Sequence, residues 1–161
     1  MKTSSMRLTN AKICDAVDIY STLLFRVAFY HTNSKVEAED ITQEVFLSLV
    51  KMQPDIVSDE HLKAWLIRST INRCKNWFKS AAKRKNVALD EASLITYSFD
   101  ITSIEVLDAI NRLKPLDKDI VFLHYYEGYS AKEIGSIVGK REDAIFMRLK
   151  RARQKLKEFL E

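Results

Sequence analysis

The 161-residue sequence predicts an all-α protein composed of two small helical domains joined by a linker. Glycine occurs 3 times and proline twice, whereas average usage would give roughly 11 and 8 in a chain of this length. Tight hairpins use both residues at their turns, so this scarcity argues against an all-β fold. Apolar residues instead recur near the 3.6-residue period of amphipathic helices. Residues 86–102 lack basic residues and a sustained period, which predicts a linker between domains at residues 7–85 and 103–161.

The composition also bears on the class of protein. With 47% hydrophobic residues, the chain can bury a core. With 30% charged residues and no apolar run of about 20 residues, the sequence does not predict a membrane protein. The first ten residues lack the apolar stretch of a signal peptide. Cys14 and Cys74 are too far apart to form a metal-ligand pair. We therefore expect a reduced, cytoplasmic protein without a metal site.

Three amphipathic helices are expected in the N-terminal domain, over about residues 13–30, 36–52 and 61–83. Polar residues at 32–34 break the first pattern and can cap the second helix. A proline and three acids predict a loop over residues 53–60. The predicted apolar faces of the second and third helices comprise Ile41, Val45, Leu49, Met52, Ile67, Ile71, Cys74 and Phe78.

The second and third helices each carry a further stripe of residues at helical spacing. These stripes are Asp40, Glu44, Leu47 and Lys51 on the second helix, and Arg68, Asn72, Lys75 and Lys79 on the third. Residues 36–60 contain seven acids and one base, whereas residues 61–85 contain eight bases and no acid. Such a basic block repels itself unless an anion accompanies it. This basic block and the eight further bases in residues 140–161 indicate two surfaces that bind nucleic acid. The alternative is that both are solvent-exposed helix faces with no binding function.

The C-terminal domain is expected to begin with two short helices. The first starts at about residue 103 and Pro115 ends it, because proline cannot continue a helix. Asp117 is placed to cap the second, over about residues 118–126. Gly128 follows and can adopt the left-handed conformation that closes a helix.

Residues 130–145 have the pattern of a helix-turn-helix. Ser130 and Glu133 are spaced as a capping box, Gly139 supplies the turn, and Gly135 lies where the two helices must approach closely. The second helix of the motif, about residues 141–160, carries the basic residues Arg148, Lys150, Arg151, Arg153, Lys155 and Lys157. A helix of this kind can enter the major groove, with cations near phosphates and other side chains near base edges.

Five segments together resemble bacterial sigma factors of the extracytoplasmic-function (ECF) family, in the family's order and over almost the whole chain. The resemblance to region 4 is carried by residues 113–130 (LKPLDKDIVFLHYYEGYS), 132–139 (KEIGSIVG) and 144–153 (AIFMRLKRAR). The resemblance to region 2 is carried by residues 38–46 (AEDITQEVF) and 64–72 (AWLIRSTIN). Two motif sets joined by a linker are far more specific than either set alone.

The resemblance implies a non-enzymatic transcription initiation factor with no catalytic residue and no cofactor. It implies that the first domain binds core RNA polymerase and the promoter −10 element, and that the second binds the −35 element and the flap of the β subunit. The expected partners are core polymerase (its β and β′ subunits), promoter DNA and an anti-sigma factor.

The resemblance also assigns site residues by position. Core-polymerase binding falls on Asp40, Gln43, Glu44 and Leu47, −10 binding on Arg68, Asn72, Lys75 and Lys79, and −35 binding on Arg141, Phe146, Met147, Arg148, Lys150 and Arg151. Phe146 and Met147 depart from the family pattern of a basic residue followed by a serine. They cannot donate hydrogen bonds, so they either contact thymine methyl groups or face another partner.

Two other functions are compatible with parts of the sequence. A stand-alone helix-turn-helix regulator would bind duplex DNA as a dimer, and would need neither the surface at Asp40 and Glu44 nor the basic block. A metal-dependent nuclease would use the carboxylates of the second helix, but no histidine or further aspartate accompanies them at ligand spacing. Co-purification with core polymerase separates the sigma factor from both.

Overall fold

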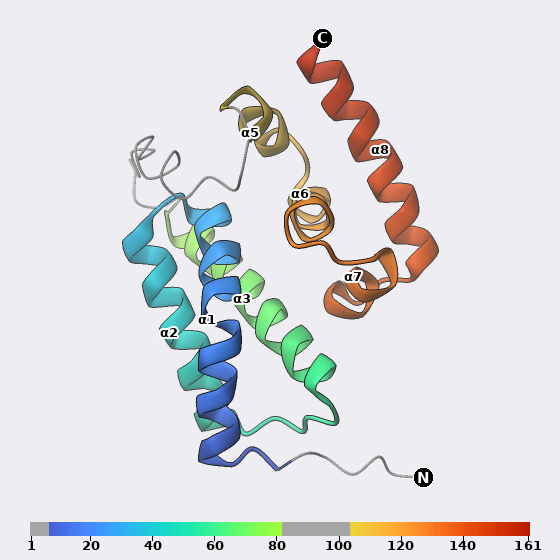
Figure 1. Cartoon of the computed structure of the whole chain (residues 1–161). Coiled ribbons are helices and arrows are strands. Elements are labelled where there is room, and N and C mark those ends of the chain that lie inside the picture. The colour runs from blue at the N-terminus through green and yellow to red at the C-terminus, as the bar shows by residue number, and fades with distance from the viewer. Residues whose placement is uncertain (1–6, 82–103) are drawn as a thin grey trace. The chain divides into compact units, whose positions relative to one another are not determined.

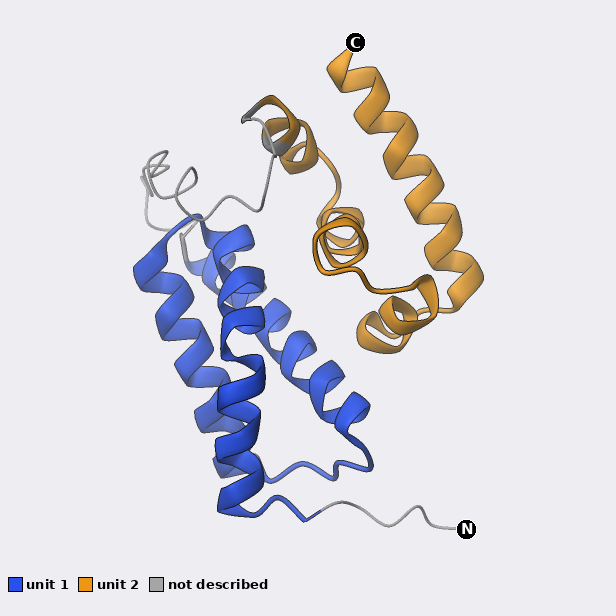
Figure 2. Cartoon of the chain, in the orientation of Figure 1, with its two compact units in different colours: residues 1–96 blue, residues 97–161 orange. Residues whose placement is uncertain are grey.

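The structure of the chain, a computed structural model, describes residues 7–81 and 104–161 (Figure 1). These residues form helices and no β-strand, which confirms the all-α prediction. The chain divides into two compact units, residues 1–96 and 97–161 (Figure 2). The predicted linker over residues 86–102 lies outside the described residues.

Over residues 7–81, unit 1 is a bundle of three helices: α1 (Asn10–Thr32), α2 (Lys35–Met52) and α3 (Asp59–Ala81). Each of these helices packs against the other two. Side chains from all three helices and from the loop before α3 are fully buried between them: Leu24, Phe29, Leu49, Ile56, Leu66 and Ile67. Thr9 and Ser34 cap α1 and α2 by accepting backbone N–H groups of the first turn, as their side chains are suited to do.

For two residues of unit 1, the prediction of a buried position is wrong. Met52 is 68% exposed and Phe78 is 45% exposed. Met52 is the last residue of α2, and the chain turns away at Gln53, whose φ is 45°. Phe78 lies in the last turn of α3, where its ring packs edge-on against Trp77. The apolar period of a sequence can continue to the end of a helix, but a residue there is buried only if a neighbouring element extends far enough to pack against it.

The described residues of unit 2, 104–161, form five helical segments: α5 (Ile104–Asn111), α6 (Pro115–Val121), η1 (Phe122–Tyr126), α7 (Ala131–Val138) and α8 (Glu142–Leu160). The prediction that Asp117 caps a helix at residue 118 is wrong. The helix begins at Pro115 with Lys114 as its N-cap residue, because the fixed φ of proline suits the first helical position. Asp117 therefore lies inside the first turn, where it is buried.

The segment η1 is a single turn of π-helix that continues α6. The ring of Phe122 stacks on Tyr126, and Nδ1 of His124 lies 2.8 Å from the carbonyl oxygen of Tyr129. Because a carbonyl only accepts, Nδ1 carries the proton in this hydrogen bond. His124 thus holds the turn that leads into α7.

The predicted helix-turn-helix is formed by α7 and α8. The capping box is complete: the Ser130 hydroxyl accepts from the backbone N–H of Glu133, and the Glu133 carboxylate accepts from that of Ser130. Gly139 has a φ of 74°, which favours glycine. A Cβ atom on Gly135 would lie 2.6 Å from the carbonyl oxygen of Lys140. The close approach expected at Gly135 is therefore to the backbone of the turn.

Within residues 7–81 and 104–161, no helix combines the length and the apolar character needed to cross a membrane.

Candidate interaction surfaces

The first surface lies on α2 and is called the acidic surface here. It consists of Asp40, Gln43, Glu44 and Leu47, all of which are exposed. Leu47 is 55% exposed, whereas Ile41, Val45 and Leu49 of the opposite stripe are buried. The structure thus brings the four residues predicted to bind polymerase onto one exposed face of a packed helix.

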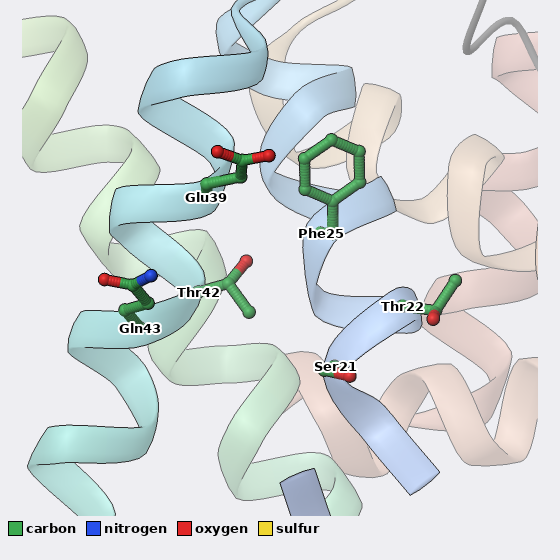
Figure 3. A pocket seen from close by; sticks show the side chains of 6 residues that line it. All are labelled: Ser21, Thr22, Phe25, Glu39, Thr42 and Gln43. Carbon is green, nitrogen blue, oxygen red and sulfur yellow. The ribbon is translucent and has the colours of Figure 1, made fainter. Parts of the chain in front are cut away.

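A groove of about 310 Å³ lies beside the acidic surface, between α1 and α2 (Figure 3). It is lined by Ser21, Thr22, Phe25, Glu39, Thr42 and Gln43. The Thr42 hydroxyl donates to the backbone carbonyl of Ala38 at 2.7 Å, so this polar group is already satisfied within α2. Because Gln43 belongs to both features, the groove extends the acidic surface onto α1. No motif in the sequence indicated this pairing of α1 with α2.

The second surface, called the basic surface, lies on α3. Its members Arg68, Asn72, Lys75 and Lys79 are all exposed, as their helical spacing predicted. They lie on one helix face while Ile67, Ile71 and Cys74 are buried. Three cations therefore surround one amide, which suits an anionic chain that also presents hydrogen-bonding bases.

Arg73 joins the two surfaces of unit 1. Its guanidinium donates to the Glu44 carboxylate at 3.0 Å and also to the hydroxyl of Ser48. The Arg73 side chain is 36% exposed and that of Glu44 is 56% exposed. The pair links α3 to α2 and places a cation within the acidic surface. Sequence reasoning missed this role, since the two residues are 29 positions apart.

The third surface is the exposed face of α8. Phe146 is 57% exposed and Met147 is 53% exposed, and Arg141, Lys150 and Arg151 are exposed as well. The buried face of the helix consists of Ile145, Leu149 and Ala152.

Arg148 differs from the other residues predicted to bind the −35 element. Its guanidinium donates to the carboxylate of Asp117 on α6 at 2.9 Å. The Arg148 side chain is only 31% exposed, and that of Asp117 is 10% exposed. Arg148 thus joins α8 to α6 within unit 2.

Within the parts of the chain that the structure describes, no group of three or more histidine, cysteine or acidic side chains is placed to hold a metal ion.

Comparison with known proteins identifies the family. The model of sigma-70 region 2 matches residues 16–84, and the model of sigma-70 region 4 matches residues 103–156. Together the two models cover most of the chain. The chain is a sigma factor of the sigma-70 family. Region 2 carries the acidic and basic surfaces, and region 4 carries the helix-turn-helix.

Two relatives illustrate the likeness. The sigma factor shares 31% identity over 138 residues with the ECF RNA polymerase sigma factor BldN of Streptomyces coelicolor, which covers 80% of this chain and 52% of BldN. It shares 27% identity over 129 residues with the RNA polymerase sigma factor CarQ of Myxococcus xanthus, which covers 76% of this chain and 74% of CarQ. The chain thus spans about half the length of BldN.

Two solved structures have the same fold. The sigma factor RpoE of Bartonella quintana, solved in complex with the anti-sigma factor NepR, superposes with a TM-score of 0.70 at 20% identity and covers 91% of this chain and 95% of its own. CnrH, solved with the cytosolic domain of CnrY, superposes with a TM-score of 0.73 at 19% identity over 95% of this chain and 90% of its own.

Proposed function

We propose that this chain is an ECF sigma factor that binds core RNA polymerase in the cytoplasm and directs initiation at specific promoters, with no catalytic activity of its own. The observation that carries the proposal is that region 2 presents an acidic surface on α2 and a basic surface on α3. A stand-alone helix-turn-helix regulator would use neither surface. The two surfaces fit two different partners, one basic and one anionic.

The acidic surface is proposed to bind a basic coiled coil of the polymerase clamp. Asp40 and Glu44 supply charge complementarity, which favours fast and specific association. Leu47 adds an apolar contact at the C-terminal end of the acidic surface. Because Glu44 already accepts a hydrogen bond from Arg73, Asp40 is the more available carboxylate for an incoming cation.

The basic surface is proposed to hold the −10 element as single-stranded DNA. Asn72 offers an amide with one acceptor and two donors to the Watson–Crick edge of an unpaired base. Arg68, Lys75 and Lys79 are proposed to contact neighbouring phosphates, which contribute affinity without sequence preference.

The exposed face of α8 is proposed to enter the major groove at the −35 element. Arg141, Lys150 and Arg151 are proposed to contact phosphates or base edges, while Phe146 and Met147 are proposed to contact thymine methyl groups. Arg148 is proposed to act through position, because its ion pair with Asp117 holds α8 at a fixed angle on α6.

An anti-sigma factor is the proposed regulator. RpoE was solved bound to the anti-sigma factor NepR, and this chain has the same fold. A partner that covers the acidic surface would exclude polymerase, since one helix face cannot serve two proteins at once.

Binding to core polymerase tests the proposal. The full chain should compete with another sigma factor for core enzyme, and the Asp40→Lys, Glu44→Lys double variant should compete at least about tenfold more weakly, because reversed charges oppose a basic partner. The matched control reverses Asp15 and Asp18, two exposed acids of α1, and should compete like the wild type. Equal competition by both double variants would contradict the assigned surface. A wild-type chain that fails to bind core polymerase would contradict the proposed function.

A further inference from the structure

The exposed face of α8 has an unusual composition for a DNA-binding helix. At 3.6 residues per turn, positions i, i+3, i+4 and i+7 share one face. Asp143, Phe146, Met147 and Lys150 stand in this relation, and all four are exposed. The opposite face is buried in unit 2, so the four residues point away from its core.

The first two turns of this face present no cation. Between residues 142 and 149 the sequence holds two acids, Glu142 and Asp143, and a single base, Arg148. Arg148 is bound to Asp117 and is mostly covered. Within the helix, the first cation of the exposed face is therefore Lys150, in the third turn, and the N-cap residue Arg141 precedes the helix and pairs with Asp143.

The carboxylate of Asp143 is held in place. One oxygen, Oδ1, accepts from the backbone N–H of Ala144 at 3.0 Å and lies 3.5 Å from Nε of Arg141. The position in the first turn adds the favourable field of the helix N-terminus. These partners offset part of the repulsion that a carboxylate would meet beside DNA. The Asp143 side chain remains 74% exposed, so a ligand can reach it.

The chemistry of the major groove then restricts what this face can recognise. A carboxylate accepts a hydrogen bond from the N4 amino group of cytosine, whereas guanine presents only the acceptors N7 and O6. Adenine also carries a donor, its N6 amino group, but the acceptor N7 beside it repels a carboxylate, so cytosine is the better partner. Apolar side chains match the C5 methyl group of thymine. The usual basic contact with guanine is not offered by the first two turns of α8.

We propose that α8 recognises the −35 element through acceptor and apolar contacts: Asp143 accepts from a cytosine, and Phe146 and Met147 contact thymine methyl groups on the adjoining base pairs. This inference rests on the proposed function. The seven steps along the helix from Asp143 to Lys150 give a rise of about 10.5 Å, which matches roughly three base steps of 3.4 Å. The contacted strand is therefore rich in pyrimidines, and Lys150 marks the end of the element.

The experiment uses the full chain with core polymerase and a promoter library in which the −10 element is fixed and the −35 element is randomised. Each −35 variant is linked to a barcode downstream of the start site, and sequencing of the transcribed barcodes should identify active variants that carry a cytosine followed or preceded by thymines on one strand. Replacing that cytosine should lower wild-type initiation by roughly 5- to 150-fold. Replacing a contacted thymine with deoxyuridine removes only the methyl group and should lower initiation about fourfold.

Variants connect each preference to a side chain. Asp143→Ala should lose the discrimination for cytosine, and Phe146→Ala or Met147→Ala should become indifferent to deoxyuridine at one position. Phe159→Ala is the matched control, because Phe159 is a partly exposed aromatic residue near the other end of α8 and should retain every preference. Circular dichroism checks that each variant keeps its helices.

The results separate the inference from the function on which it rests. Transcripts that favour guanine opposite the first two turns would overturn the inference, as would cytosine and methyl preferences that persist in the Asp143 and Phe146 variants. Either result leaves promoter-directed initiation in place. The absence of transcripts from every library member would contradict the proposed function itself.

Discussion

The ion pair between Asp117 and Arg148 allows a quantitative prediction about how region 4 holds its DNA-binding helix. The two substitutions Asp117→Asn and Arg148→Met each remove one charge of the same ion pair, whose atoms lie 2.9 Å apart, but they should not cost the same. Arg148→Met leaves a carboxylate that is 10% exposed without its cation, and removing one partner of a buried pair costs about 3 kcal/mol or more. Asp117→Asn leaves a guanidinium that is 31% exposed and can rehydrate, so we expect about 1.5 kcal/mol, near the lower end for a charged hydrogen bond.

The double variant should cost less than the sum of the single variants, with a coupling free energy of about 1 to 1.5 kcal/mol. The matched control is the pair of Asp108 on α5 and Arg112, the residue after that helix, whose side chains are 66% and 59% exposed. Such surface pairs contribute less than about 0.5 kcal/mol.

The assay must report on region 4. Both tryptophans, Trp65 and Trp77, lie in α3, so their fluorescence follows unit 1. Hydrogen exchange of peptides from α6, α7 and α8 in urea gives the local free energy of opening in unit 2. A coupling as small as that of the control pair, or equal costs for the two single variants, would refute the view that Arg148 positions α8. A loss of about one unit in the salt slope of promoter binding in Arg148→Met would instead indicate a phosphate contact.

Three further predictions concern the other elements. Asn72→Ala should reduce initiation by an amount that depends on the −10 sequence, because one unpaired base loses its amide partner. Asn76 is an exposed residue nearby on α3, and Asn76→Ala should have little effect in the same titration of promoter variants. Lys150→Ala should weaken promoter binding and flatten its salt slope by roughly one unit if the ammonium group contacts a phosphate; an unchanged slope in a titration over salt would contradict that contact. Gly135→Val should destabilise unit 2 by at least about 2 kcal/mol, since a Cβ would lie 2.6 Å from the Lys140 carbonyl oxygen and overpacking of this kind costs about 1 to 3 kcal/mol. If hydrogen exchange gave this variant the stability of the wild type, the turn would be free to shift and the reasoning would be wrong.

Local sequence rules predicted the features that depend on neighbours in the chain. The capping box of Ser130 and Glu133 needs only residues three apart, and the structure confirms it. The turn at Gly139 likewise follows from its own backbone conformation. The exposed faces of α2 and α3 were predicted because a helical period fixes which side chains point together.

Features that depend on distant residues could not be predicted in this way. Asp117 is of a residue type that often caps helices. Its actual partner, Arg148, is 31 positions away in the sequence, and only the packing of unit 2 brings the two side chains together. The pairing of Glu44 with Arg73 has the same cause. The exposure of Met52 depends on where the neighbouring elements end, which periodicity does not encode. The roles assigned to the individual site residues remain predictions.

The most direct test of the central claim is transcription by core polymerase with and without this chain on a library of bacterial promoters. The account predicts discrete transcripts that require the chain and core polymerase together, start at a fixed distance downstream of matched −35 and −10 elements, and disappear when either element is removed. No chain-dependent transcript from any promoter, combined with tight binding of duplex DNA by the chain alone as a dimer, would contradict it and favour a stand-alone helix-turn-helix regulator.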